Sequence, residues 1–213
     1  MNFTRDDAKN LFAALEHHDR VCQVDLVLQG MLFRAVAMMM RRPFPALARL
    51  SLFCEVERPL AFPSGFLGGS APCLKSFQLQ GVVIPALITL LSSASDLVEL
   101  YYLISIPQDG YISPESMVAC LAGLPRLHTL FIQTHTATSH TDRLRPSPII
   151  RTSLPALTVF TFLGGSEYLE DLVVRIDRHG CGFITIMYLN ESLTFKLRNS
   201  SSSSTAPKPP GYP

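Results

Sequence analysis

The stretch from Pro43 to Leu52 reads PFPALARLSL, and it holds the pattern from which we predict the fold. Leu47, Leu50 and Leu52 form the series apolar-x-x-apolar-x-apolar, with proline and alanine just upstream. Leu50 and Leu52 are separated by one polar residue, as inward-facing residues are along a short β-strand. Leu47 would then pack inward from the approach to that strand.

The same pattern recurs along the chain. Its central apolar residues in successive copies are Val24, Leu50, Phe77, Leu100, Leu130, Phe160 and Ile184. Subtracting neighbouring positions gives steps of 26, 27, 23, 30, 30 and 24 residues. This is the first half of the leucine-rich-repeat consensus with a long and uneven period. Because one such unit cannot bury its own apolar face, we expect the units to stack.

The segments between the copies suit helices. Ser113-Pro114-Glu115 places an N-cap residue, a first-turn proline and an acid in order, so a helix should run from there to Ala122 and stop at Gly123. Further helical segments are expected over Asp6–His18, Gln29–Met40, Pro85–Ser92 and Ser166–Asp177.

This alternation of strands and helices predicts an α/β fold with one parallel sheet. We interpret residues 1–198 as an irregular leucine-rich-repeat-like solenoid, with helices or loops on the other face of the sheet. Residues 134–153 should form a long exposed loop, and residues 199–213 a disordered tail rich in Ser and Pro. The alternative is an α/β sandwich with helices on both faces, which favours strands that are apolar at every position. The strands are expected, in chain order, near Gln23–Leu28, Arg49–Phe53, Ser76–Gln80, Val98–Leu103, His128–Gln133, Thr158–Leu163 and Phe183–Met187.

The composition narrows the class of protein. Of 213 residues, 47% are hydrophobic and 16% charged, which is typical of a folded chain and not of a disordered one. The net charge of +1 gives no strong field for nucleic acid or for an anionic membrane, so we expect neither as a partner.

The cysteines indicate a reducing compartment. There are five, at scattered positions and without C-x-x-C spacing, and we expect them to be reduced and mostly buried. The first ten residues lack the features of a secretory signal. We therefore expect the protein in the cytoplasm or the nucleus.

No motif of a known chemistry stands out, and we expect neither catalysis, nor a cofactor, nor a bound metal. His135 and His140 lie in a polar segment without further ligands at metal spacing. The glycine-rich turn at residues 65–69 lacks the Gly-Lys-Ser/Thr of a phosphate loop and should be a loop tip. The acids between Glu167 and Asp171 lie where a helix begins, and the helix dipole stabilises acids there.

Several short stretches of the sequence occur in the same order as in one family of proteins. They are ALEHHDRVCQVDL (Ala14–Leu26), PFPALARLSL (Pro43–Leu52), FLGGSAPCL (Phe66–Leu74), LSSASDLVEL (Leu91–Leu100), IPQDGYISPESMVACLAGLPRL (Ile106–Leu127) and LPALTVFTFLGGSEYLEDLVVRID (Leu154–Asp177). From about Leu11 to Asp177 the chain resembles fungal F-box and leucine-rich-repeat-like proteins.

This resemblance implies a protein-binding module like the substrate-recognition part of ubiquitin-ligase adaptors, with ligase components among its partners. Only the repeat region shares the likeness. The residues before Leu11 are too few for an F-box, and the likeness fades after Asp177. The alternative is a stand-alone scaffold, or a truncated paralogue, that has no association with a ligase.

We expect the binding surface on the sheet face that points away from the core. The residues there follow from strand alternation. Phe53, Tyr101, Leu103, Phe131 and Leu163 would form an apolar stripe across neighbouring strands, and an exposed stripe of this kind marks a partner site. The polar candidates on the same face are Gln78, Gln80 and Gln133. The competing interpretation is that another segment, such as residues 134–153, covers the stripe as part of the core.

The tail contains a second candidate. Pro209-Pro210-Gly211-Tyr212 matches P-P-x-Y, a form that WW domains accept in polyproline II conformation. A chance match of four residues is the competing explanation.

Overall fold

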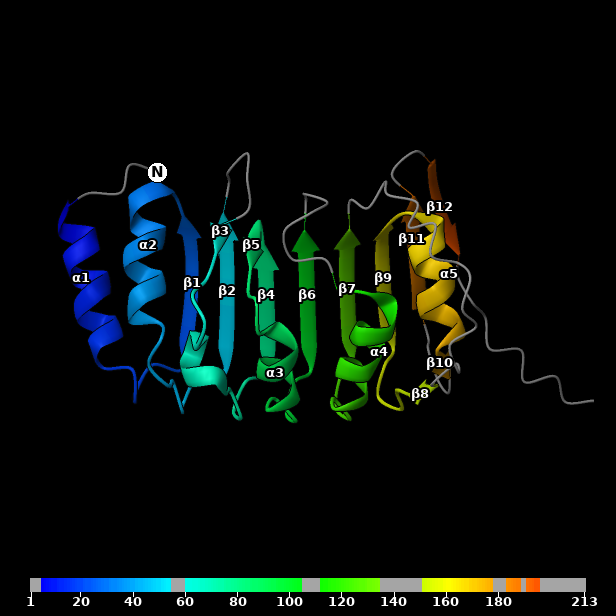
Figure 1. Ribbon diagram of the computed structural model, residues 1–213, viewed down its shortest axis with the longest axis horizontal. Coiled ribbons are helices and arrows are strands. Elements are labelled where there is room, and N and C mark those ends of the chain that lie inside the picture. The colour runs from blue at the N-terminus through cyan, green and yellow to red at the C-terminus, as the bar shows by residue number, and fades with distance from the viewer. Residues whose placement is uncertain are drawn as a thin grey trace, which may run out of the picture.

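One eight-stranded sheet forms the body of the protein (Figure 1). The computed structural model describes residues 5–54, 60–104, 112–134, 151–177, 183–188 and 191–195. Seven strands lie side by side in chain order, and every neighbouring pair among them is parallel. They are β1 (Gln23–Leu28), β2 (Arg49–Cys54), β4 (Ser76–Gln80), β6 (Glu99–Ile104), β7 (Thr129–Thr134), β9 (Val159–Gly164) and β11 (Phe183–Tyr188). The predicted strands and their parallel order are confirmed, with ends that differ by one residue at most.

An eighth strand, β12 (Glu191–Phe195), pairs antiparallel with β11 at the end of the sheet. The sequence pattern did not predict it. It follows β11 in the chain after residues 189–190, and a connection of two residues is the usual link between antiparallel neighbours.

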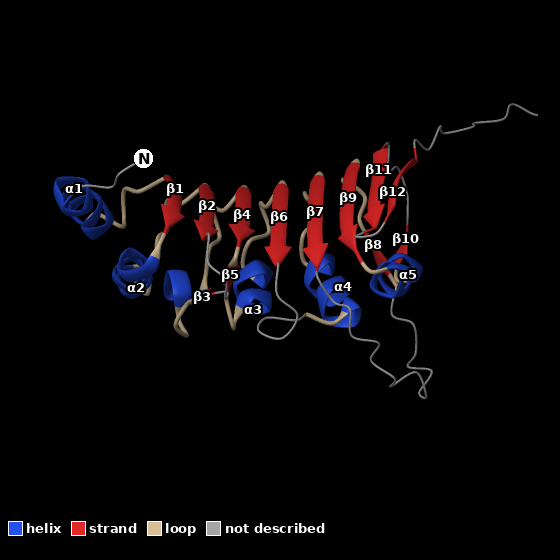
Figure 2. Cartoon of the chain, turned by 90° about the horizontal axis from the view of Figure 1, so that it is seen from above, coloured by secondary structure: helices blue, strands red, loops and turns tan. Residues whose placement is uncertain are grey.

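The described helices lie on one side of the sheet, except that α1 is displaced beyond the β1 edge (Figure 2). They are α1 (Arg5–Glu16), α2 (Gly30–Met39), α3 (Leu87–Ser92), α4 (Pro114–Ala122) and α5 (Ser166–Val174), with a 3-10 turn η1 (Phe66–Gly69). In α4, the backbone N–H of Ser116 donates to Ser113 Oγ at 3.2 Å, so the predicted cap is confirmed. The two-sided sandwich would also place helices on the opposite face, where the described part of the chain has none.

Five strands, β2, β4, β6, β7 and β9, are entered through the same turn. In each turn, the backbone N–H of a leucine donates to the carbonyl three residues earlier at an N···O distance of 3.0 to 3.2 Å. The leucines are Leu47, Leu74, Leu97, Leu127 and Leu157. The first and last residues of each turn are both buried, so each turn adds one apolar residue to the core besides its leucine. Proline, which favours the second position of such a turn, occupies it in four of the five.

The strand entries are also bonded to one another. The carbonyl of Cys22 accepts the N–H groups of Ala48 and Arg49, and that of Ala48 accepts those of Lys75 and Ser76. In the same way, the carbonyls of Lys75, Val98 and His128 each accept two consecutive N–H groups at the next strand entry. The N···O distances of all these bonds are 2.8 to 3.1 Å. Because consecutive strand entries make the same backbone contacts, the strands stay in register although the segments between them differ in length.

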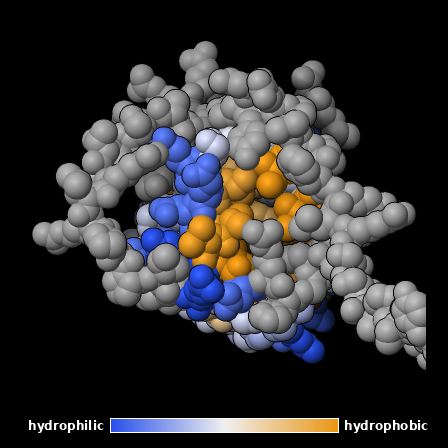
Figure 3. Space-filling view, turned by 90° about the vertical axis from the view of Figure 1, so that its right-hand side faces the viewer, coloured by the Kyte–Doolittle hydropathy of each residue, from blue (hydrophilic) through white to orange (hydrophobic). Residues whose placement is uncertain are grey.

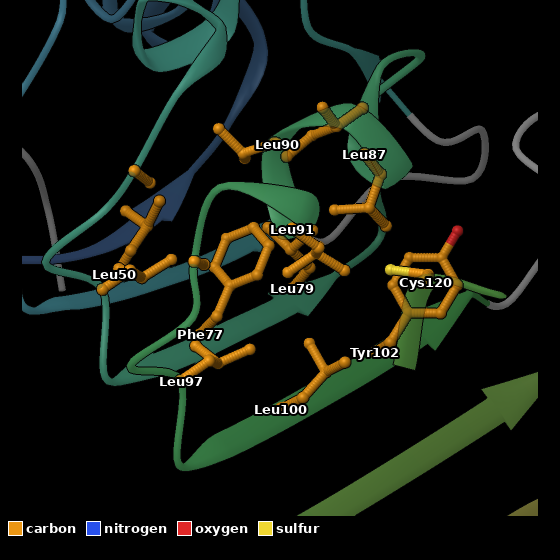
Figure 4. Close-up of a cluster of buried hydrophobic side chains, with 14 of the residues drawn as sticks. Leu50, Phe77, Leu79, Leu87, Leu90, Leu91, Leu97, Leu100, Tyr102 and Cys120 are labelled. Atoms are coloured by element: carbon orange, nitrogen blue, oxygen red, sulfur yellow. The ribbon is translucent and has the colours of Figure 1, made fainter. Parts of the chain in front are cut away.

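The core lies between the sheet and its helices (Figure 4). Side chains from alternate strand positions, such as Phe77 and Leu79 on β4, point toward Leu87, Leu90 and Leu91 of α3, and all five are at most 3% exposed. On the next strand, Tyr102 lies beside Cys120 of α4 (Figure 4). Burial raises the pKa of the Tyr102 hydroxyl well above its usual range.

Two short parallel pairs lie on the helix side, namely β3 (Leu60–Ala61) with β5 (Val82–Val83) and β8 (Thr152–Ser153) with β10 (Ile176–Asp177). The second pair corrects two predictions. The last helix ends at Val174 and not at Asp177, because the carbonyl of Arg175 already accepts the N–H of Thr152 at 2.8 Å. Within the loop expected over residues 134–153, Thr134 is the last residue of β7, and Thr152 and Ser153 form β8. Residues 135–150 lie outside the described part of the chain.

The glycine-rich turn is not a loop tip. Phe66 and Leu67 of η1 are buried, and the N–H of Leu67 donates to the carbonyl of Met40 at 2.6 Å. The Phe66 ring packs 4.4 Å from that of Phe62, which lies 4.8 Å from Phe33 of α2, centroid to centroid. The turn therefore fills the space beside α2 that a helix would otherwise occupy.

Candidate binding surface

The sheet face opposite the helices presents three rows of side chains. Parallel pairing in register brings equivalent strand positions together, about 4.8 Å apart from strand to strand. The entry row holds Gln23, Arg49, Ser76, Glu99, Thr129 and Val159. The middle row holds Asp25, Ser51, Gln78, Tyr101, Phe131, Thr161 and Thr185. The exit row holds Val27, Phe53, Gln80, Leu103, Gln133, Leu163 and, by its backbone register, Met187.

All eight predicted binding residues lie on this open face, in the middle and exit rows. Each of them is half-buried, as expected for side chains that stand next to one another on a sheet. Ser51 is an exception in the middle row, because only 8% of it is exposed. Its side chain is short compared with those of Arg49 and Phe53 on the same strand.

The centre of the face is an aromatic pair. Tyr101 on β6 and Phe131 on β7 are register partners, and their rings stack at a centroid distance of 6.1 Å and an interplanar angle of 25°. Leu103 lies two residues along β6 from Tyr101, and Leu163 lies diagonally from Phe131 on β9. Each of these four apolar residues is next to another of them along a strand, across the register or on the diagonal, over three neighbouring strands.

The fifth apolar residue of the expected stripe stands apart. Phe53 on β2 is separated from Leu103 by Gln80 of β4, so the stripe is interrupted. Val27, the register partner of Phe53, is 61% exposed and was not among the predicted residues. Val27 follows the first copy of the pattern directly, as Phe53 follows the second, and this equivalence would have revealed it.

Charged residues of this face lie in the entry row and on the β1 edge. Arg49 and Glu99 lie in the entry row, where Ser76 Oγ donates to Glu99 Oε2 at 2.8 Å, and Asp25 lies on the edge strand β1. From β2 to β11, the middle and exit rows hold only apolar, hydroxyl and amide residues. The surface that contains the aromatic pair is therefore neutral.

The end of the sheet at β11 and β12 has a different character. Seen from that end, apolar side chains gather in the middle of the described surface, and hydrophilic ones lie to their left and below them (Figure 3). Val173 of α5 and Ile186 of β11 are only partly buried against the core.

Three further observations concern metal ligands, a cavity and the length of the helices in the described residues. In the part of the chain that the structure describes, no three His, Cys, Asp or Glu side chains lie close enough to hold a metal ion. A cavity of about 320 Å³ between α3 and the start of α4 is lined by groups such as Leu87, Tyr102 and Ser116, without a charged residue among them. None of the described helices is both long and apolar enough to span a membrane. The residues His135, His140, Pro209, Pro210 and Tyr212 lie outside the described residues.

The described cysteines are free thiols in two environments. Cys22 and Cys73 are exposed, whereas Cys54 and Cys120 are buried, so the expectation of mostly buried thiols holds for two of these four. Burial raises the pKa of the Cys54 thiol, and it raises the pKa of Cys120 to about 11.

We expect iodoacetamide at about pH 8 to modify Cys22 and Cys73 in the native protein and Cys54 and Cys120 only in urea. The thiolate is the reactive form, and with a pKa of about 11 only about one Cys120 thiol in a thousand is ionised at that pH. Mass mapping of alkylated peptides measures the four sites separately. Fast native labelling of Cys120 would show that α4 leaves the sheet readily, contrary to the packing described above.

Comparison of the chain with models of protein families, with characterised proteins and with solved structures found no match in any of the three. The family resemblance, which is based on short stretches of sequence between Leu11 and Asp177, therefore stays a prediction.

Proposed function

We propose that the chain is a run of stacked leucine-rich-repeat-like units, an irregular solenoid, whose open sheet face binds another protein. The identical strand-entry turns and shared carbonyl acceptors support stacking, since each unit contacts the next through the same backbone groups. One-sided placement of the described helices leaves the other sheet face available (Figure 2).

The observation that favours protein binding most is the stacked pair of Tyr101 and Phe131. Aromatic side chains on a solvent-facing sheet gain little from the core, yet they are the residue type most often found at the centre of protein interfaces. Leu103 and Leu163 extend the pair into a cluster, and amides and hydroxyls surround it. An apolar centre with a polar rim is the usual layout of such an interface.

Two versions of this function differ in their partners. The resemblance to F-box proteins favours a substrate-recognition module that works with a ubiquitin ligase, and the alternative is a scaffold that binds its target alone. Purification of the tagged chain from cells, followed by mass spectrometry, separates them. Skp and cullin subunits should copurify in the first case, and only the target in the second.

We expect Tyr101→Ala and Phe131→Ala each to weaken binding of the copurified target by more than about 1 kcal/mol, or about fivefold in Kd. Each change removes a ring from the centre of the interface. The melting temperature should fall by only a few degrees, because neither ring lies in the core. Calorimetric titration of the purified target and thermal unfolding of each variant measure the two effects.

The matched control is Ile88→Ala on α3, which removes a 39% exposed apolar side chain from the opposite side of the molecule. Its target affinity should equal that of the wild type. If Ile88→Ala weakens binding as much as Tyr101→Ala does, the open face is not the binding surface.

A further inference from the structure

The exit row alternates between apolar and amide side chains. From β2 to β9 it reads Phe53, Gln80, Leu103, Gln133 and Leu163, one residue from each of five adjacent strands. All five are half-buried. A linear ligand that crosses the strands along this row would meet an apolar contact and an amide in turn.

The spacing of the apolar members selects the conformation of such a ligand. Adjacent strands are about 4.8 Å apart, so Phe53, Leu103 and Leu163 recur every two strands, or about 9.6 Å. A polyproline II helix has three residues per turn and a rise of about 3.1 Å, so the same side returns every 9.3 Å or so. The mismatch over the two steps is then only about 0.6 Å.

Other regular conformations fit this row less well. Side chains on one face of an extended strand recur about every 6.6 Å, which places the second contact between two anchors. Seven residues of α-helix advance about 10.5 Å, so the mismatch grows to nearly 2 Å, roughly three times as much, over the same two steps. The regular conformation that matches all three apolar residues is polyproline II.

The amides match the backbone of this ligand. A polyproline II segment makes no internal hydrogen bonds, so its carbonyls need donors from outside. Gln80 and Gln133 alternate with the apolar residues, and each amide has two N–H donors as well as an acceptor oxygen. That capacity allows a bond to a ligand carbonyl beside any contact the side chain makes within the protein.

Charge and shape point to the same ligand. The exit row and the adjoining middle row contain no charged residue between β2 and β11, so a charged segment would lose hydration there without gaining a partner. The stacked rings of Tyr101 and Phe131 border Leu103, and aromatic walls are a general feature of surfaces that bind polyproline II segments.

From this alternation, its spacing and its neutrality, we propose that the exit row binds an uncharged, proline-rich segment of a partner in polyproline II conformation, with an apolar side chain every third residue. The proposal rests on the proposed function and names the chemistry of the bound partner. Phe53, Leu103 and Leu163 contact the three apolar side chains, and Gln80 and Gln133 donate to the carbonyls between them.

Two synthetic peptides of the same composition test this. One is the capped nonamer Leu-Pro-Pro repeated three times, and the other is Leu-Pro-Leu-Pro-Leu followed by four prolines. The first should bind the full chain with a Kd between about 10 μM and 1 mM, and the second at least about tenfold more weakly. The affinity of the first should change less than about twofold between about 0.05 and 0.5 M NaCl, because no charges pair in the complex.

The variants locate the site. Leu103→Ala and Gln80→Leu should each weaken binding of the first peptide by about fivefold or more, whereas Ile88→Ala should leave it unchanged. The proposal would be overturned if both peptides bound equally well. It would also be overturned if neither Leu103→Ala nor Gln80→Leu weakened binding of the first peptide. If neither peptide binds while Tyr101→Ala still weakens target binding, the partner has another conformation, and the proposed function stands without this inference. If Tyr101→Ala has no effect on target binding either, both fail.

Discussion

Gly81→Ala is expected to lower the free energy of unfolding by about 2–5 kcal/mol. Gly81 follows β4 with a φ of +66°, a conformation that costs other residues about 1–2 kcal/mol. A Cβ atom there would meet the backbone carbonyl oxygen of Cys54 at 2.2 Å, and overpacking of this kind adds about 1–3 kcal/mol. Urea titration followed by circular dichroism measures the change.

The matched control is Gly65→Ala. Gly65 also has a positive φ, of +84°, but no atom lies within 4 Å of the position its Cβ would take. This variant should therefore lose only the conformational part, about 1–2 kcal/mol. Equal losses in the two variants would mean that β2 and the residue after β4 are not as close as the structure places them.

The strands were predictable because each obeys a local rule. In β4, β7 and β9 buried and half-buried residues alternate without a break, so a short run of sequence contains the whole signal. The cap of α4 was predictable for the same reason, since Ser113 bonds to the N–H of a residue only three positions away.

Elements that depend on distant partners were not predictable. The turn η1 is held against α2 through Met40, and β8 pairs with a strand more than twenty residues later. Residues 65–69 and 152–153 have no periodicity that would reveal these contacts. The early end of α5 has the same cause, because pairing of Ile176 with Thr152 replaces a last helical turn.

The candidate surface could be predicted only in part. Strand alternation was sufficient to place Tyr101, Phe131 and Leu103 on the open face. Their grouping depends on which strands are neighbours, and only the register shows that Gln80 separates Phe53 from Leu103. The alternation of apolar and amide residues runs across strands, at positions some 23 to 30 residues apart in the chain, so a pass along the sequence does not detect it.

Phe77→Ala is expected to cost about 3–5 kcal/mol of unfolding free energy, whereas Phe131→Ala should cost no more than about 1 kcal/mol. Both residues are phenylalanines on central strands. Phe77 faces the helices and is 0% exposed, but Phe131 is half-buried on the open face. For a chain of this length the loss in Phe77→Ala corresponds to a fall in melting temperature of about 6–20 °C, measurable by differential scanning calorimetry. The pair also decides whether the open face is available to a partner. If Phe131→Ala destabilised the protein as much as Phe77→Ala, the Phe131 ring would belong to a second core, and a binding surface on that face would have to be abandoned.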